Sequence, residues 1–401
     1  MLPFADLSEA QQHQPALAEA VQDDIINGLS KIADLRVISR TSVSSYAPDQ
    51  PRNLRAIAQS LGAGHLLEGT ARRDGQKVRI TAQLTDARRG TSLWTVNYER
   101  DLAHVFGMQG DLLEKISSQL HATISADEKT AIDEQPTHDL AAYALYIQGK
   151  TLITSVSSAQ VNDKMLQAVQ ALDQAVARDP KFYLAWCQLA AAHNYIYFFG
   201  FDRTAARLAS AEAALQTAIR LRPEAGETHL AKANFLYRCH LDYDRARAEL
   251  AQTQRALPNN SEAFELAGYI DRRQGLWNES ARSLQRALQL DPRNGFVLQQ
   301  VALSYEDLRQ FRAMAAALDR ALELAPRDLE TRFTRAYVDY EWRADTRPLH
   351  QTIEALLAEN PNSAPDLADQ WLYLALSERN PAAAARAIAA IPATGISTDI
   401  N

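Results

Sequence analysis

Two stretches of the sequence combine residue types that can bind phosphate or a metal ion. GAGHLLEGT (62–70) is rich in glycine, but it contains neither the GxxxxGK[ST] loop nor a GxGxxG turn that opens a helix. The dipeptide Cys239-His240 has no further metal ligand near it in the sequence, and none of the nine histidines forms an HExxH pair. The glycines are therefore interpreted as turn and packing residues, and we expect no metal site and no cofactor.

The charged residues give no catalytic arrangement either. Asp23 and Asp24 are adjacent carboxylates, but the apolar face of their helix is carried by Val21, Ile25 and Leu29, so both are expected to be solvated. A basic cluster lies on a predicted hairpin and is interpreted as a solvated face, with an anionic partner as the alternative; its members are Arg72, Arg73, Lys77, Arg79, Arg88 and Arg89. The sequence therefore predicts a protein that is not an enzyme.

Composition limits the classes of partner. The net charge of −7 argues against a general electrostatic surface for nucleic acid, so no nucleic-acid partner is expected. No apolar run reaches the roughly 18 residues that a membrane span needs. The first residues lack the pattern of a signal peptide, which predicts a cytoplasmic chain. Cys187 and Cys239 have no CxxC spacing and are expected to be free thiols.

The first 125 residues alternate between helical and strand-like patterns. Short strands are predicted at 2–4 and 35–40, and helical spacing runs from Leu17 to Ile32 and again over 103–124. An Asp74-Gly75 turn joins two alternating runs into a hairpin, and a further strand follows at 91–100. The order β-α-β-α-β-β-β-α is typical of a small α+β domain.

A repeat replaces this pattern from about residue 139 onward. Prolines that close phrases such as ALQLDP and ALELAP stand at positions 180, 223, 258, 292, 326 and 361. Their separations are 43, 35, 34, 34 and 35 residues. A period near 34 with a proline after the second helix is typical of tetratricopeptide repeats, in which helix pairs stack into a solenoid. We predict an α+β amino-terminal domain over 1–125, a linker over 126–138, an all-α tetratricopeptide-repeat solenoid over 139–391 and a tail over 392–401.

The longest separation contains the aromatic stretch NYIYFFGFD (194–202). It lies where the first helix of a repeat turns into the second, and about nine extra residues are enough to lengthen each helix by about one turn. The aromatic side chains either pack inside this longer hairpin or stay exposed as an anchor for a partner. Membrane insertion is a third, weaker interpretation, because the stretch is short and has no basic face.

The first helices of stacked repeats line a concave groove, which is the expected binding site for a protein or peptide segment. Positions that point inward predict a set of groove residues rich in Tyr, Trp and Arg, the types most often found as binding hot spots. This set is Asn194, Tyr195, Phe235, Arg238, Tyr269, Arg272, Arg273, Glu306, Asp307 and Trp342. Tyr269, Arg272 and Arg273 are expected to face Glu306 and Asp307 of the next repeat and to form the centre of the site, with adjacent patches of opposite charge.

The chain resembles a bacterial architecture in which an α/β domain similar to the TolB amino-terminal domain precedes tetratricopeptide repeats. The likeness rests on LPFADLS (2–8), DDIINGLSKIADLRVISRTS (23–42), the run from LGAGHLLEGT to NYERDL (61–102) and AYALYIQGK (142–150). In that family the region usually lies downstream of a nucleotide cyclase, a protein kinase or a winged-helix domain, often after a membrane span. The resemblance implies that this chain is the tail of a larger protein or one with a clipped start, and that it is periplasmic if a membrane anchor precedes it.

Two functions remain open. The first is a non-catalytic protein-protein interaction scaffold or sensor module that binds a peptide or protein segment in the groove. The second is a regulatory arm of a cyclase, kinase or transcription regulator whose effector domain lies outside this chain. The sequence determines neither the identity of the partner nor the oligomeric state.

Overall fold

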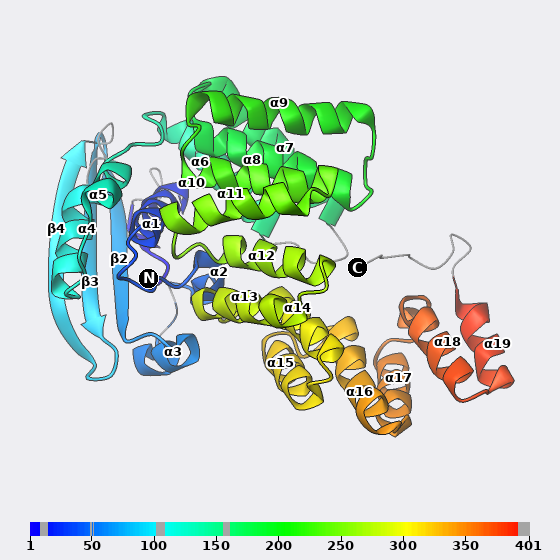
Figure 1. Ribbon diagram of the computed structural model, residues 1–401. Helices are drawn as coiled ribbons and strands as arrows, with labels where there is room; N and C mark the ends of the chain where they lie inside the picture. The colour runs from blue at the N-terminus through cyan, green and yellow to red at the C-terminus, as the bar shows by residue number, and fades with distance from the viewer. Residues whose placement is uncertain (9–14, 49, 51, 102–108, 155–160, 392–401) are drawn as a thin grey trace. The chain divides into compact units, whose positions relative to one another are not determined.

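The computed structural model describes residues 1–8, 15–48, 50, 52–101, 109–154 and 161–391 (Figure 1). The chain divides into two compact units, each described by itself below. The first unit comprises Met1–Gln274 and Arg282–Arg293. The second comprises Gly275–Ala281 and Asn294–Asn401, of which the structure describes the part up to residue 391. This division differs from the predicted boundary at 126–138, which stays a prediction.

A four-stranded sheet with the order β1-β2-β3-β4 begins the first unit. β1 (Ala5–Asp6) pairs in parallel with β2 (His65–Asp74), and β2, β3 (Lys77–Asp86) and β4 (Thr91–Asp101) are successively antiparallel. The predicted hairpin is confirmed, with Gly75 at φ +61° in its turn. The alternating residues of β3 are buried as expected: Val78, Ile80, Ala82 and Leu84.

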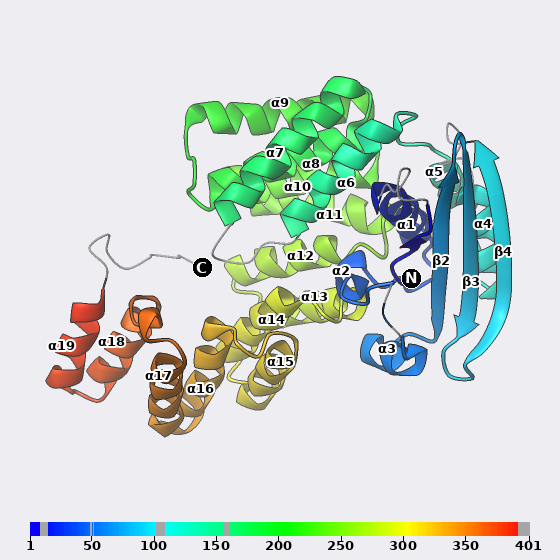
Figure 2. The ribbon, with the colours of Figure 1, turned by 180° about the vertical axis from the view of Figure 1, so that it is seen from behind.

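Helices accompany this sheet in the described residues up to 132. They are α1 (Pro15–Ser30), α2 (Arg40–Val43), α3 (Leu54–Leu61), α4 (Gln109–Gln119) and α5 (Ala126–Ile132). Leu17 and Val21 of α1 and Leu113 of α4 share one apolar core with Val78 and Ile80 of the sheet. α1 lies between the sheet and the repeats (Figure 2). The first part of the helix predicted at 103–124 lies outside the described residues, and α5 forms inside the predicted linker, where Ser125 and Glu128 make a capping box.

The strand predicted at 35–40 is wrong. Its backbone bonds to the turns of the repeats instead of to the sheet: the Ser39 N–H donates to the Leu290 carbonyl at 2.8 Å, and the Val37 N–H donates to Asn259 Oδ1 at 3.3 Å. Asn259 also donates from Nδ2 to the Ile32 carbonyl at 2.9 Å. A buried backbone N–H needs a hydrogen-bond acceptor, but that acceptor need not belong to a neighbouring strand. Alternating hydropathy alone could therefore not distinguish this segment, which we call the strap, from a strand.

The repeats of the first unit follow as stacked antiparallel helices (Figure 1). They are α6 (Leu140–Thr154), α7 (Val161–Arg178), α8 (Tyr183–Phe198), α9 (Ala205–Leu221), α10 (Gly226–Phe235), the π-helix η3 (Leu236–His240), α11 (Tyr243–Ala256), α12 (Ser261–Arg273) and, from Arg282 onward, α13 (Trp277–Leu290). α8 and α9 have 16 and 17 residues, whereas α12 and α13 have 13 and 14. The extra residues of the long repeat therefore lengthen its helices, as expected.

The second unit continues the same pattern. It contains α14 (Gly295–Asp307), α15 (Phe311–Leu324), α16 (Leu329–Arg343), α17 (Arg347–Glu359), the short 3₁₀ turns η4 (Pro361–Ser363) and η5 (Pro365–Leu367), α18 (Ala368–Ser377) and α19 (Pro381–Ala390). Side-chain caps begin several of these helices, for example Asn294, Asp328 and Asn380. Across the described residues after 140 every regular element is helical, which confirms the helical repeat region.

The expectation that Asp23 and Asp24 are solvated is wrong. Asp23 is 1% exposed and Asp24 is 6% exposed. Lys150 of α6 donates to Asp23 at 2.8 Å, Asn27 donates to it at 2.8 Å and the Tyr143 hydroxyl donates to it at 3.3 Å. The side of α1 that carries Asp23 is also buried, because α6 packs against it. The amphipathic pattern of α1 indicates only its apolar face, so it could not predict this second contact.

Removing the Asp23 carboxylate is expected to destabilise the first unit. The substitution Asp23→Ala leaves Lys150 and the Tyr143 hydroxyl without their shared acceptor, and breaking a buried ion pair in this way costs about 3 kcal/mol. Urea unfolding followed by tryptophan fluorescence measures the loss. Asp366→Ala, at an exposed position of the second unit, is the matched control and should change stability by less than about 0.5 kcal/mol. Equal losses in the two variants would show that Asp23 does not hold α1 to α6.

Candidate functional site

The predicted groove residues are divided between the two units. Asn194, Tyr195, Phe235, Arg238, Tyr269, Arg272 and Arg273 belong to the first, and Glu306, Asp307 and Trp342 belong to the second. The expected opposition of Tyr269, Arg272 and Arg273 to Glu306 and Asp307 joins the two units and stays a prediction. Arg238 and its neighbours are brought together within the first unit, and they form the candidate site.

Arg238 stacks on aromatic rings of the neighbouring repeat. Its guanidinium lies 5.3 Å from the ring centroid of Tyr195 and 6.0 Å from that of Phe198, both on α8. The Tyr195 ring in turn lies 4.3 Å from the Phe199 ring. Cation–π contacts of this kind hold the planar arginine head against the rings and leave its N–H groups directed along the ring plane.

A π-helical turn places Arg238. α10 changes at residue 236 into η3, and Leu241 ends it in the left-handed conformation at φ +54°. A π-helical turn contains about one more residue than an α-helical turn. Side chains that follow it are therefore rotated away from the directions that repeat positions predict for a regular α-helix. Such turns are frequent at functional sites, and the sequence pattern gives no signal for this one.

Two buried hydrogen-bond donors at this site have no acceptor among the described residues. The Asn194 side chain is fully buried, and its Oδ1 accepts from Cys239 Sγ at 3.4 Å, but its Nδ2 has no partner. Nε of Arg238 is likewise covered and unpaired. Buried polar groups in folded proteins are almost always paired, so these two covered donors are exceptions among the described residues.

Glu265 on α12 completes the electrostatic setting. Its pKa is raised to about 8, first by burial and then by the charges of Asp291 and Glu262, while Arg238 acts in the opposite direction. Tyr269, one turn later, is half-buried, its pKa is raised mainly by burial, and the Arg272 guanidinium lies 5.9 Å from its ring centroid. Burial and the neighbouring acidic charges thus favour the protonated form of Glu265, and the charge of Arg238 favours the ionised form.

The remaining groove residues of the first unit differ in exposure. Phe235 is 6% exposed, and its ring packs against His240 at 4.9 Å, so it supports η3 from within the core. Arg273 is exposed at the end of α12. Position counting missed Phe198, whose only sequence signal is the aromatic stretch 194–202.

The aromatic stretch 194–202 combines both interpretations given to it. Ile196 is fully buried and Tyr195 is half-buried, whereas Phe199 and Phe201 are 44% and 43% exposed. Gly200, at φ +80°, lies between the two exposed rings, whose centroids are 6.5 Å apart. The stretch therefore packs at its start and presents two aromatic side chains at its end.

In the second unit Trp342 lies at the surface and Glu306 is half-buried. The Arg343 guanidinium lies 4.1 Å from the Trp342 ring and that of Arg312 lies 5.7 Å from it. Burial raises the pKa of Glu306, and the charges of Glu341 and Asp307 raise it further. Trp342 is therefore contacted by two cations, whereas Glu306 lies among acidic neighbours.

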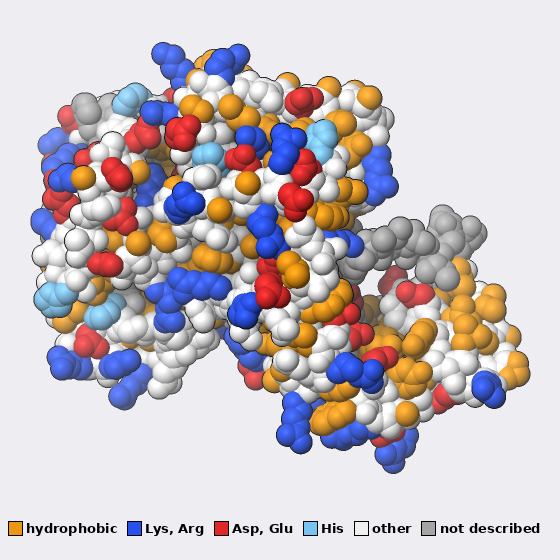
Figure 3. Space-filling view, in the orientation of Figure 1, with side chains coloured by type: hydrophobic (Ala, Val, Ile, Leu, Met, Phe, Trp, Pro, Cys, Tyr) orange, Lys and Arg blue, Asp and Glu red, His pale blue; other side chains and the backbone are white. Residues whose placement is uncertain are grey.

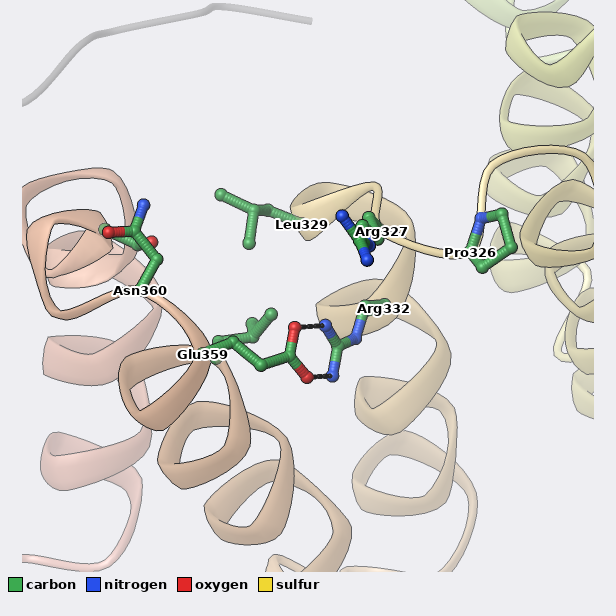
Figure 4. A pocket seen from close by; sticks show the side chains of 8 residues that line it. Pro326, Arg327, Leu329, Arg332, Glu359 and Asn360 are labelled. Atoms are coloured by element: carbon green, nitrogen blue, oxygen red, sulfur yellow. Dashed lines mark hydrogen bonds and ion pairs between the residues drawn. The ribbon is translucent and has the colours of Figure 1, made fainter.

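A cavity of about 750 Å³ also lies in this unit, between the turns at Pro326 and Asn360 (Figure 4). Two arginines line it, Arg327 and Arg332, and Arg332 is already paired, because it makes two hydrogen bonds of 2.7 and 2.8 Å to Glu359. Because the two charges neutralise each other in this bidentate pair, neither Arg332 nor Glu359 is available to bind a charged ligand.

Two further observations apply to the described part of the chain. It contains no group of three or more His, Cys, Asp or Glu side chains placed to hold a metal ion. None of its helices combines the length and the hydropathy that a membrane crossing requires. Charged side chains of both signs are interspersed over the face in Figure 3, with apolar side chains between them.

Comparison with known proteins identifies the helical architecture and gives one sequence relative. No protein-family model matches the chain. A protein of Rhizobium meliloti (strain 1021) named "Putative adenylate cyclase 3" is 31% identical over 180 residues, which is 44% of this chain and 30% of that protein. The chain thus spans less than a third of the length of this relative.

The structural likenesses concern the repeats. The human IFIT1 dimer with m7Gppp-AAAA superposes with a TM-score of 0.50 at 16% identity, covering 72% of this chain and 64% of IFIT1. A tetratricopeptide protein of Thermus thermophilus covers 49% of this chain at 19% identity with a TM-score of 0.40, and PilF of Pseudomonas aeruginosa covers 53% at 18% with 0.41. The likeness to IFIT1, together with the period near 34 residues and the stacked helix pairs, supports a helical repeat region of the tetratricopeptide type, and it extends to the fold alone.

The pKa of Glu265 predicts a pH dependence of stability. The folded chain holds this proton up to about pH 8, whereas the unfolded chain releases it near pH 4.5. Between these values the folded state binds more protons, so this group makes the unfolding free energy fall as pH rises, with no further change outside that range. Glu265→Gln removes the effect, and its stability relative to the wild type should rise by up to about 3.5 kcal/mol between pH 5 and pH 8. Urea unfolding at both pH values measures the difference, and a pH-independent difference contradicts it.

Proposed function

We propose that this chain is a non-catalytic interaction scaffold whose repeats hold a peptide or protein segment of a partner. The observation that carries the proposal is the site around Arg238. The Arg238 guanidinium of η3 lies over two aromatic rings of α8, so a cation and aromatic side chains meet on the first helices of neighbouring repeats. Arg and Tyr are residue types that often carry binding energy in interfaces, and this arrangement supplies no activated nucleophile for turnover.

The predicted centre at Tyr269, Arg272 and Arg273 belongs to the same proposal. Tyr269 lies on α12, the first helix of the repeat after the one that contains η3. The charge of Arg238 lowers the pKa of its hydroxyl, against the larger effect of burial. A segment that contacts Arg238 can therefore continue along α12 to Tyr269 and Arg272. Tyr and Arg are the residue types that most often carry binding energy in interfaces.

The likeness to the Rhizobium meliloti protein favours a second function. The name of that relative indicates a cyclase, and 70% of its length has no counterpart in this chain. Under this proposal the repeats and the α+β portion, with its resemblance to the TolB amino-terminal domain, form the regulatory arm of a cyclase, kinase or transcription regulator. Nucleotide turnover by the purified chain would contradict the non-catalytic assignment.

Peptide selection tests the scaffold proposal. A random dodecapeptide library displayed on phage should yield peptides that bind the immobilised chain. Tyr269→Ala combined with Arg272→Ala should weaken the enriched peptides by about 2 kcal/mol, which is roughly thirtyfold in Kd, because hot-spot residues cost this much when truncated. Arg245→Ala is the control, since Arg245 is exposed on α11 and pairs with the nearby Asp242.

Two outcomes would contradict the proposal. Failure to enrich any peptide argues against a segment-binding scaffold. Enriched peptides that bind the double variant, Arg238→Ala and Arg245→Ala equally well place the binding site away from these residues. Circular dichroism of each variant checks that the helices are retained.

A further inference from the structure

β4 forms one edge of the sheet, and among the described residues it pairs along one side only. Its 11 residues pair with β3, and the sheet order β1-β2-β3-β4 places no further strand beside it. Both ribbon views show this edge on the side of the first unit away from helices α6 to α13 (Figure 1, Figure 2). An edge strand presents backbone N–H and C=O groups to which another strand can bond.

The features that usually protect an edge strand from pairing are missing from most of β4. Proteins place prolines, lysines or bulges on such strands, but residues 91–98 contain no charged residue and no proline. The register shift between Leu84 and Thr85 lies opposite residue 93, so β4 is regular from Trp94 to Asp101. Trp, Thr, Val and Tyr, which dominate this part, are residue types that favour strands. The edge is therefore suited to pairing with a further strand.

The register of the sheet shows which backbone groups of β4 point outward. The turn at 75–76 has two residues, so Asp74 and Lys77 close the hairpin as a hydrogen-bonded pair. Bonded and non-bonded pairs alternate from there across β3 to β4. The carbonyl of Glu99 agrees with an outward direction, because it accepts from the Arg100 side chain at 3.1 Å. The residues whose backbone groups face the free edge are Thr95, Asn97 and Glu99.

A second β4 strand matches this edge when it runs antiparallel and each Asn97 lies opposite its own copy. In this register Thr95 lies opposite Glu99 of the second copy, so outward backbone groups meet outward backbone groups. Glu99 is balanced within its own chain, because Lys77 and Arg79 each donate to it at 2.9 Å. No like charges therefore oppose each other on this face of the joined strands.

The side chains on the core side of β4 are complementary in the same register. Val96 lies opposite Tyr98 of the second copy, and Trp94 lies opposite Arg100, which gives two favourable kinds of cross-strand pair. Trp94 and Val96 pack against the core but are only half-buried, so a second strand would cover their open side. Arg100 already lies on this side, 5.9 Å from its own Tyr98 ring, and its ion pair with Asp111 is long at 3.9 Å. The strand is thus complementary to itself, which favours a second copy as its partner.

We propose that the free edge of β4 is a self-association surface, on which a second copy of this chain pairs through residues 94–100. The two four-stranded sheets then form one continuous sheet, with a two-fold axis at Asn97. Because contact between two edges buries less area than a standard interface, we expect a weak dimer with a Kd on the order of 10 µM. This inference goes beyond the scaffold function and does not depend on the site around Arg238.

Sedimentation velocity of the full chain measures the association. The mass should rise from 44.5 kDa toward twice that value over about 1 to 100 µM protein. Asn97→Lys places two like charges opposite each other at the axis and should weaken the dimer by at least about tenfold, and Asn97→Asp should do the same. A chain that stays monomeric up to about 100 µM overturns the inference, and the edge is then left for a strand of another protein.

A mixture of the two variants tests the register. The lysine of one chain then faces the aspartate of the other, so a heterodimer should form with about the affinity of the wild type. Thr95→Lys is the matched control, because it lies on the same face two residues away, faces Glu99 of the second copy, and should change the affinity by less than about threefold. Asn97 and Thr95 are both exposed, and circular dichroism checks that each variant keeps its fold. Equal losses in Asn97→Lys and Thr95→Lys, or a mixture that stays monomeric, overturn the inference.

Discussion

The buried carboxylate of Asp23 is the contact on which the first unit depends. It accepts from Asn27 within its own helix and from Lys150 and Tyr143 of the first repeat, so one side chain joins α1 to α6. The apolar cluster around it extends without a break from Phe4, ahead of the sheet, to Phe235 in α10. A charge this deeply buried is stable only while its partners stay in place, and the sheet and the early repeats consequently fold as one body.

Local patterns predicted the helices and the hairpin well, because periodicity, caps and prolines act over a few residues. The period near 34, the longer α8 and α9 and the alternation of Val78 to Leu84 all followed from such patterns. The errors arose where the decisive partner lies far away in sequence. Residues 35–40 bond to Asn259 and Leu290, and Asp23 bonds to Lys150, and neither pairing leaves a local trace.

The candidate site was predicted in its residue types but not in its arrangement. Counting repeat positions selected Tyr195 and Arg238, whose side chains contact each other, yet it omitted Phe198 because the longer α8 extends beyond the positions that were counted. Nδ2 of Asn194 and Nε of Arg238 have no acceptor among the described residues. Whether a buried donor is paired depends on the positions of all the atoms around it. A property of this kind can be recognised only after the chain has been folded.

The strap, together with residues 41–44 that follow it, also changes how the repeat array unfolds. Repeat arrays usually fray one repeat at a time, since each helix pair contacts only its neighbours. Here Thr41 and Ser42 donate to Asp291, and Asn259 is bonded to the backbone near Ile32, so two inter-repeat turns are fastened to the amino-terminal portion. Helices α11 to α13 cannot then open without releasing the strap, which makes their opening cooperative with that of the sheet. Local opening that does not involve the sheet is then confined to the helices from α14 onward. Exchange of backbone amides with solvent would begin there.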